Sequence, residues 1–251
     1  MSSNDASLPV SDLSTILNIV AVERLIQQWL MEDIPSFDFG AAAVGDMREE
    51  AWIICKADGI LAGVPFVNAV FKELGCTIEW EYREGCLLVP PVKVAKVNGP
   101  AYRLLQGERL ALNIITRASG IAKQARKAKD LAQAESWHGK VVGTRKVTPG
   151  FRLVEKYALL VGGIGQHRND LSSMVMLKDN HIWSAGDISK VGNPSSGLHP
   201  AVSLLCVTCN IYPLSRQSRW REKFVVSHRR LKWNAGRTMK RARQPMLELR
   251  L

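Results

Sequence analysis

Hydrophobic and polar positions along the first half of the chain follow the patterns of a mixed α and β domain. In residues 13–32 apolar side chains recur at helical spacing, with Ser14 as a candidate N-cap and Pro35 just past the end. Further helices are predicted at residues 64–74 and at 104–121, continuing into the cationic segment 123–129. Strands are predicted at residues 51–57, 76–82 and 92–97. This mixture predicts a small α+β domain over residues 1–115.

The pattern changes after residue 115 to short strands that alternate with a helix. Residues 140–143 and 174–177 are short apolar runs, and the segment 151–160 between them has helical spacing. Strand, helix and strand in this order are typical of βαβ units, which build parallel sheets and barrels. We therefore predict a parallel sheet or barrel after the first domain.

The formal net charge of +11 is concentrated near the C-terminus. Residues 191–251 hold 12 of the 34 Lys and Arg residues but only 2 of the 23 Asp and Glu residues. This composition predicts a disordered basic tail that is not part of the preceding fold. Such a tail attracts nucleic acid or anionic membranes electrostatically, but it contains no recognisable binding module, so we expect no specific nucleic-acid partner.

The remaining composition favours a cytoplasmic protein. The first residues lack the basic and apolar regions of a signal peptide, and no apolar run is long enough to span a membrane. Five cysteines, an odd number, argue for reduced thiols. Cys206 and Cys209 form a single Cys-x-x-Cys pair without a second pair at zinc spacing, so no bound metal is predicted there.

Basic side chains follow the predicted barrel strands. Arg145 and Lys146 follow the strand at 140–143, His167 and Arg168 follow the glycine-rich turn, and Lys178 follows the strand at 174–177. Residues at the carboxyl ends of parallel barrel strands meet at one mouth, where active sites lie. A cluster this cationic repels itself unless an anion fills it. The sequence therefore predicts a pocket for a multiply anionic small molecule.

Several ordered motifs resemble the quinolinate phosphoribosyltransferase family. They are Gly-Glu-Arg-Leu-Ala-Leu-Asn at 107–113, Ser-Gly-Ile-Ala at 119–122, Gly-Thr-Arg-Lys-Val-Thr-Pro-Gly-Phe-Arg-Leu-Val-Glu-Lys-Tyr at 143–157, His-Arg at 167–168 and Val-Met-Leu-Lys-Asp-Asn-His at 175–181. The resemblance covers most of residues 10–190. It implies an α/β fold in which an N-terminal α+β sandwich domain over residues 1–115 is followed by an incomplete TIM-like α/β barrel over residues 116–190. It implies a glycosyltransferase of NAD biosynthesis that joins quinolinate to phosphoribosyl pyrophosphate, with Mg²⁺, giving nicotinate mononucleotide, pyrophosphate and CO₂.

The resemblance also implies roles for individual residues. Arg145, His167, Arg168 and Lys178 are expected to hold the two carboxylates of quinolinate, with Lys178, Arg145 and His167 as the catalytic set. Lys146 is expected to contact the substrate or the phosphoribosyl donor. Arg109 is expected to reach the same substrate across the interface of a homodimer or higher homo-oligomer.

The chain departs from the family pattern after His181. The family pattern continues with acidic residues at strand ends and glycine-rich phosphate loops, whereas residues 191–251 contain only Glu222 and Glu248 as acids. We therefore expect impaired activity. A non-catalytic splice variant or subunit that binds full-length partners is the alternative, and a nucleic-acid or membrane-surface binder acting through the tail is a weaker one. Lys190, Val191 and Gly192 fit codons that resemble a splice donor, so a retained intron is a hypothesis for the tail.

Overall fold

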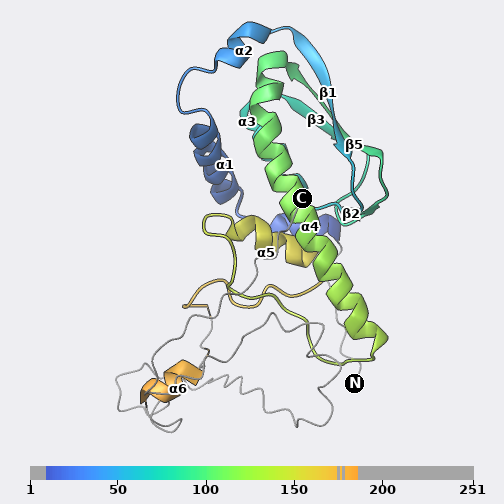
Figure 1. The fold of residues 1–251 in the computed structure, drawn as a ribbon, viewed down its shortest axis with the longest axis vertical. Coiled ribbons are helices and arrows are strands. Elements are labelled where there is room, and N and C mark those ends of the chain that lie inside the picture. The colour runs from blue at the N-terminus through green and yellow to red at the C-terminus, as the bar shows by residue number, and fades with distance from the viewer. Residues whose placement is uncertain (1–9, 174–175, 177–178, 186–251) are drawn as a thin grey trace, which may run out of the picture. The chain divides into compact units, whose positions relative to one another are not determined.

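The computed structural model describes residues 10–173, 176 and 179–185 (Figure 1). Residues 10–173 belong to one compact unit, and the short helix α6 (Asp179–Ala185) belongs to a second. Helix α6 was not predicted. Of the strand predicted at 174–177 only Met176 is described, and it is in no helix or strand. Lys178 and the predicted basic tail lie outside the described residues.

The N-terminal helical segment is broken where one continuous helix was predicted. A 3-10 helix, η1 (Val10–Ile16), precedes α1 (Ile19–Asp33). The predicted cap at Ser14 is wrong, because Asn18 has extended backbone angles and its side-chain oxygen accepts a hydrogen bond from the amide of Ala21 at 3.2 Å. Asparagine is among the strongest N-cap residues, so the α-helix begins after it.

Three antiparallel strands form the main sheet, and the three predicted strands are confirmed with shifted ends. They are β1 (Arg48–Cys55), β3 (Thr77–Trp80) and β5 (Val92–Pro100), in the order β1-β5-β3. The register of β1 against β5 shifts between Ile53 and Ile54. Two elements too short to predict, β2 (Gly59–Ile60) and β4 (Leu87–Leu88), form a separate antiparallel pair.

Helices α3 (Val64–Glu73) and α4 (Ala101–Ala134) pack on one side of this sheet (Figure 1). The short helix α2 (Phe39–Val44), capped by Asp38, also contacts α4. Gly107 allows the two long helices to approach closely, because a Cβ atom there would lie 2.9 Å from both Phe71 and Leu74. Sheet and helices thus form the predicted α+β layers.

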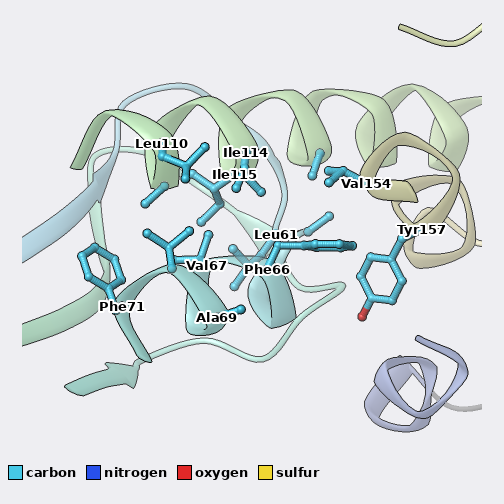
Figure 2. Packing of buried hydrophobic residues seen from close by; sticks show 14 of the residues in the cluster. Leu61, Phe66, Val67, Ala69, Phe71, Leu110, Ile114, Ile115, Val154 and Tyr157 are labelled. Carbon is cyan, nitrogen blue, oxygen red and sulfur yellow. The ribbon is translucent and has the colours of Figure 1, made fainter. Parts of the chain in front are cut away.

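The apolar core lies between α3, α4 and a third helix, α5 (Arg152–Val161) (Figure 2). The rings of Phe66 and Tyr157 meet edge to face, with centroids 5.6 Å apart, and both side chains are fully buried. Helix α4 runs without a break past the predicted domain boundary at residue 115, and its second half packs against α5. The core is therefore continuous from the first domain to the start of the predicted barrel.

Small residues set the distance between α4 and the end of α5. A Cβ atom at Gly162 would lie 2.4 Å from the Cβ of Ala125 and 2.6 Å from the backbone oxygen of Ala122. Both alanines are buried on α4. Since neither neighbour is a flexible side chain, the helices approach this closely only because residue 162 is glycine.

Glu84, in the segment between β3 and β4, is hydrogen-bonded to both α3 and α5. One carboxylate oxygen accepts hydrogen bonds from the amides of Gly63 and Val64 at 2.6 and 3.0 Å, at the N-terminus of α3. The other accepts from the Tyr157 hydroxyl at 2.5 Å. Burial nevertheless raises the pKa of this carboxyl above its ordinary value, with the three hydrogen bonds opposing the shift.

We expect Gly162→Ala to lower the free energy of unfolding by about 1–3 kcal/mol, because the new methyl group overpacks the α4–α5 contact. Urea denaturation measures the change. Gly120→Ala is the matched control: nothing lies within 4 Å of a Cβ there, and it should stabilise α4 by about 0.5–1 kcal/mol. A loss of stability at position 120, or none at position 162, would contradict the packing described.

The raised pKa of Glu84 gives a prediction for pH. A carboxyl group whose pKa is higher in the folded than in the unfolded chain contributes stability at low pH that is lost as pH rises through the folded pKa. The stability of the wild type relative to Glu84→Gln should therefore fall as pH rises above the ordinary glutamate pKa and through the raised pKa of the folded protein. Glu84→Ala, which leaves the two amides and the hydroxyl unpaired, should cost about 2 kcal/mol or more. A pH-independent difference between wild type and Glu84→Gln would exclude the burial effect.

Candidate functional site

Two of the three predicted strand ends lie side by side. Val142 and Gly165 form a parallel bridge, in which the amide of Gly143 donates to the oxygen of Gly165 at 2.8 Å and the amide of Gly165 donates to Val141 at 3.0 Å. The predicted strand at 140–143 is thus reduced to a single bridging residue. Because the two bridged segments are parallel, the residues that follow them, 144–146 and 166–168, continue in the same direction next to each other.

Four of the predicted site residues are on these two segments. Arg145 is half-buried, and its Nε atom is buried without a hydrogen-bond partner among the described residues. Lys146 is exposed, and its amide donates to the Thr144 hydroxyl at 3.0 Å. Arg168 is 8% exposed, and His167 is half-buried. The structure therefore brings four cationic or titratable side chains to adjacent strand ends.

His167 has a left-handed backbone conformation, with φ of +58°. This region is rare for residues other than glycine and costs on the order of 1–2 kcal/mol. Strain of this kind persists where surrounding contacts impose it, and it is concentrated at functional sites. The hydrophobic pattern did not predict this conformation, because a single residue at positive φ leaves no periodic signal, although histidine adopts it more often than most residues other than glycine.

Of the other two predicted site residues, Arg109 is not brought to this cluster within the described chain. Arg109 is exposed on α4, two turns before Arg117, and within the described chain it makes no hydrogen bond or ion pair with the strand ends. Arg117, on the same helix, pairs with α5: its Nε atom lies 3.8 Å from the carboxylate of Glu155. Lys178 lies outside the described residues.

The segment after the first strand end is held by Glu155. Its carboxylate accepts hydrogen bonds from the Thr148 hydroxyl at 2.7 Å and from the Thr148 amide at 3.2 Å. Glu155 is 8% exposed, although its neighbours in the predicted helix include the charged residues Arg152 and Lys156. Sequence reasoning missed its role, because charged residues in a helix normally indicate a solvent-facing surface.

A cavity of about 460 Å³ adjoins the two segments. Its lining includes Thr148 and Gly150 after the first strand end, Gln166 and Asn169 at the second, and Lys156 of α5. Neither Arg145 nor His167 lines it. The cavity therefore borders the loops that carry the basic residues and not the basic cluster itself.

Comparison with known proteins identifies the relatives of this chain. Residues 38–119 match the sequence model for the N-terminal domain of quinolinate phosphoribosyl transferase, and residues 121–210 match the model for its C-terminal domain. The crystal structure of NadC from Streptococcus pyogenes is similar with a TM-score of 0.65 and 32% identity, covering 74% of this chain and 68% of that one. The chain belongs to the quinolinate phosphoribosyltransferase family.

Curated relatives of this quinolinate phosphoribosyltransferase family member agree. Nicotinate-nucleotide pyrophosphorylase [carboxylating] from Rattus norvegicus is 49% identical over 178 residues, and the protein of that name from Homo sapiens is 48% identical over 178 residues. Both alignments cover 71% of this chain, which spans only 60% of the length of these relatives. The match to the C-terminal domain model ends at residue 210, which is 20 residues beyond the barrel boundary predicted at residue 190. The domain limits given above stay predictions.

The described residues contain no group of three or more His, Cys, Asp or Glu side chains placed to hold a metal ion. The carboxylates nearest to the strand ends in sequence are already engaged: Glu155 binds Thr148, and Asp170 accepts from the amides of Ser172 and Ser173 at 2.8 Å. The cationic side chains at these strand ends are suited to an anion. Among the same residues, no helix has the length and apolar content to cross a membrane.

The orphaned Nε of Arg145 leads to a stability prediction. A buried donor without a partner costs about 1–3 kcal/mol, so Arg145→Met should raise the free energy of unfolding by about 1 kcal/mol. Lys146→Met, at the exposed neighbouring position, should change it by less than about 0.5 kcal/mol. Chemical denaturation of the three proteins without ligand tests this, and a less stable Arg145→Met would show that the guanidinium is satisfied in the free protein.

Proposed function

We propose that this chain binds quinolinate at the two adjacent strand ends and acts in the quinolinate phosphoribosyltransferase reaction of NAD biosynthesis. The observation that carries the proposal is the parallel bridge between Val142 and Gly165, which brings Arg145 and Lys146 next to His167 and Arg168. Two carboxylates on one small ring require this density of positive charge. The names of the curated relatives support the same reaction class.

The proposed chemistry uses the basic residues for positioning and charge stabilisation. Arg145 offers a planar fork to one carboxylate of quinolinate, and its unpaired Nε is a donor already in place. With the substrate held, the pyridine nitrogen forms a bond to the ribosyl carbon as the bond to pyrophosphate breaks. The carboxyl group next to that nitrogen then leaves as CO₂, and the carbon left behind takes up a proton. In the family pattern Lys178 joins Arg145, His167 and Arg168 around the substrate.

Mg²⁺ is proposed to enter with phosphoribosyl pyrophosphate, and not to be held in advance by the protein. Mg²⁺ prefers oxygen ligands and is commonly bound through substrate phosphates. Lys146, exposed at the end of its strand, is the proposed contact to the substrate or to that donor. Arg109, exposed on α4, is proposed to complete the site of a partner subunit in a homodimer or higher homo-oligomer.

We also propose that this chain has impaired turnover. Acidic residues at further strand ends belong to the family pattern, and residues 191–251 offer only Glu222 and Glu248. This scarcity favours, as a second candidate function, a non-catalytic subunit that binds quinolinate or full-length partners. The free thiols Cys55, Cys76 and Cys86 fit the cytoplasm as the proposed location.

Calorimetric titration of the purified chain with quinolinate tests the proposed site. We expect saturable binding that Arg145→Ala weakens by about 10-fold or more, because loss of one charge-assisted bidentate contact is worth about 1.5–3 kcal/mol. Arg24→Ala, at an exposed position on α1, is the matched control and should leave binding unchanged. Absence of quinolinate binding to the wild type would refute the proposal.

Turnover is measured separately, as formation of nicotinate mononucleotide from quinolinate and phosphoribosyl pyrophosphate with Mg²⁺. Binding without turnover supports the non-catalytic candidate. Turnover that Lys178→Ala abolishes would show instead that the chain is a working enzyme and that the proposed impairment is wrong. Salt-dependent binding of nonspecific RNA, without quinolinate binding, would favour a role for the basic segment at 191–251.

A further inference from the structure

Lys156 is a buried lysine that the site described so far leaves without a role. It lies in the middle of α5 and is 2% exposed. Lysine is almost never this buried unless its ammonium group is paired. Among the described residues it forms no ion pair with a carboxylate. Its location therefore requires another explanation than a salt bridge.

The partners of Lys156 are backbone oxygens on either side of His167. Its Nζ donates hydrogen bonds to the oxygen of Gln166 and, at 3.2 Å, to the oxygen of Arg168. In return, the side-chain amide of Gln166 donates to the backbone oxygen of Lys156 at 3.3 Å. One ammonium group thus fixes the peptide group immediately before His167 and the peptide group immediately after Arg168, which enclose these two residues.

The first of these two residues, His167, is the strained one. His167 has φ of +58°, and a conformation of this cost persists only where neighbouring contacts impose it. Two carbonyl groups directed at the same ammonium restrict the backbone between them. Burying a charged group that meets only carbonyl oxygens is itself costly, since desolvation is incompletely compensated. The strain at His167 and the burial of Lys156 therefore both involve one turn. This turn carries His167 and Arg168, two of the proposed quinolinate contacts.

We infer that Lys156 is a positioning residue that holds the His167–Arg168 turn in the conformation that binds quinolinate. It acts through the backbone of the turn and does not contact the substrate. The effect on quinolinate binding rests on the proposed function. The claim that Lys156 holds the conformation of the turn does not. A lysine that merely attached α5 to the barrel would change stability without changing the turn selectively.

Lys156→Met tests the inference in the full chain, because methionine keeps the length and apolar stem but removes the donors. We expect a folded protein with a quinolinate Kd raised by about 10- to 100-fold, since a misplacement of about 1 Å at a site can cost 100-fold. The matched control is Lys123→Met. Lys123 also donates to a backbone oxygen, that of Asp58 at 3.2 Å, but its side chain is 42% exposed. The Kd of Lys123→Met for quinolinate should stay within about twofold of the wild-type value.

A double-mutant cycle separates positioning from general stability. Glycine adopts positive φ without cost, so the turn in His167→Gly depends less on the ammonium group. The factor by which Lys156→Met weakens quinolinate binding should therefore be smaller in the His167→Gly background than in the wild type. Equal factors in both backgrounds, or an unchanged Kd in Lys156→Met, would overturn the inference.

Hydrogen exchange measured without ligand makes the structural part independent of the proposed function. Amides of residues 166–169 should exchange faster in Lys156→Met, while those of α4 keep their wild-type rates. Unchanged exchange in the turn, or equal acceleration throughout α4 and α5, would overturn the inference. If the wild type fails to bind quinolinate, the proposed function fails, and this exchange result still decides whether Lys156 holds the turn. If Lys156→Met does not fold, Lys156→Gln serves the same comparisons.

Discussion

The burial of three consecutive polar residues on α5 is the constraint on which the arrangement of the site depends. Glu155, Lys156 and Tyr157 are 8%, 2% and 0% exposed. Successive residues of a helix point about 100° apart, so their polar ends require partners in three directions. Glu155 reaches Thr148, Lys156 reaches the backbone around His167, and Tyr157 reaches Glu84. One helix thereby fixes both strand ends and the first domain relative to one another.

This arrangement explains how the described residues hold the two strand ends side by side without an extensive strand ladder. The parallel pair in the described residues is a single bridge at Val142 and Gly165, which gives little stability by itself. Helix α5 supplies the missing restraint through its buried hydrogen bonds, and α4 in turn holds α5 through the close contact at Gly162. The site is therefore held by helix packing and buried hydrogen bonds more than by strand pairing.

Sequence patterns predicted the elements whose signal is local. The apolar spacing in α3 and α4 and the runs in β1, β3 and β5 located these elements, and the order of basic residues after 143 and 165 located the strand ends. The start of α1 was missed because Asn18 and Ser14 are both good caps, and only tertiary packing selects between them. Glu84, Glu155 and Lys156 were missed for a different reason. A charged residue is predicted to face solvent unless its partner is known, and their partners are backbone groups or residues distant in sequence.

The buried polar groups of the described residues differ in how completely their hydrogen-bonding capacity is satisfied. The carboxylate oxygens of Glu84 and Glu155, and the ammonium group of Lys156, have hydrogen-bond partners within the protein. At the strand ends, by contrast, Arg145 retains a buried donor without a partner, and His167 retains an unfavourable backbone conformation. A fold that satisfies its buried charges so fully elsewhere has the means to satisfy these as well. Their persistence at adjacent strand ends supports the proposed anion site, in which interactions with the ligand would offset costs that the free protein carries.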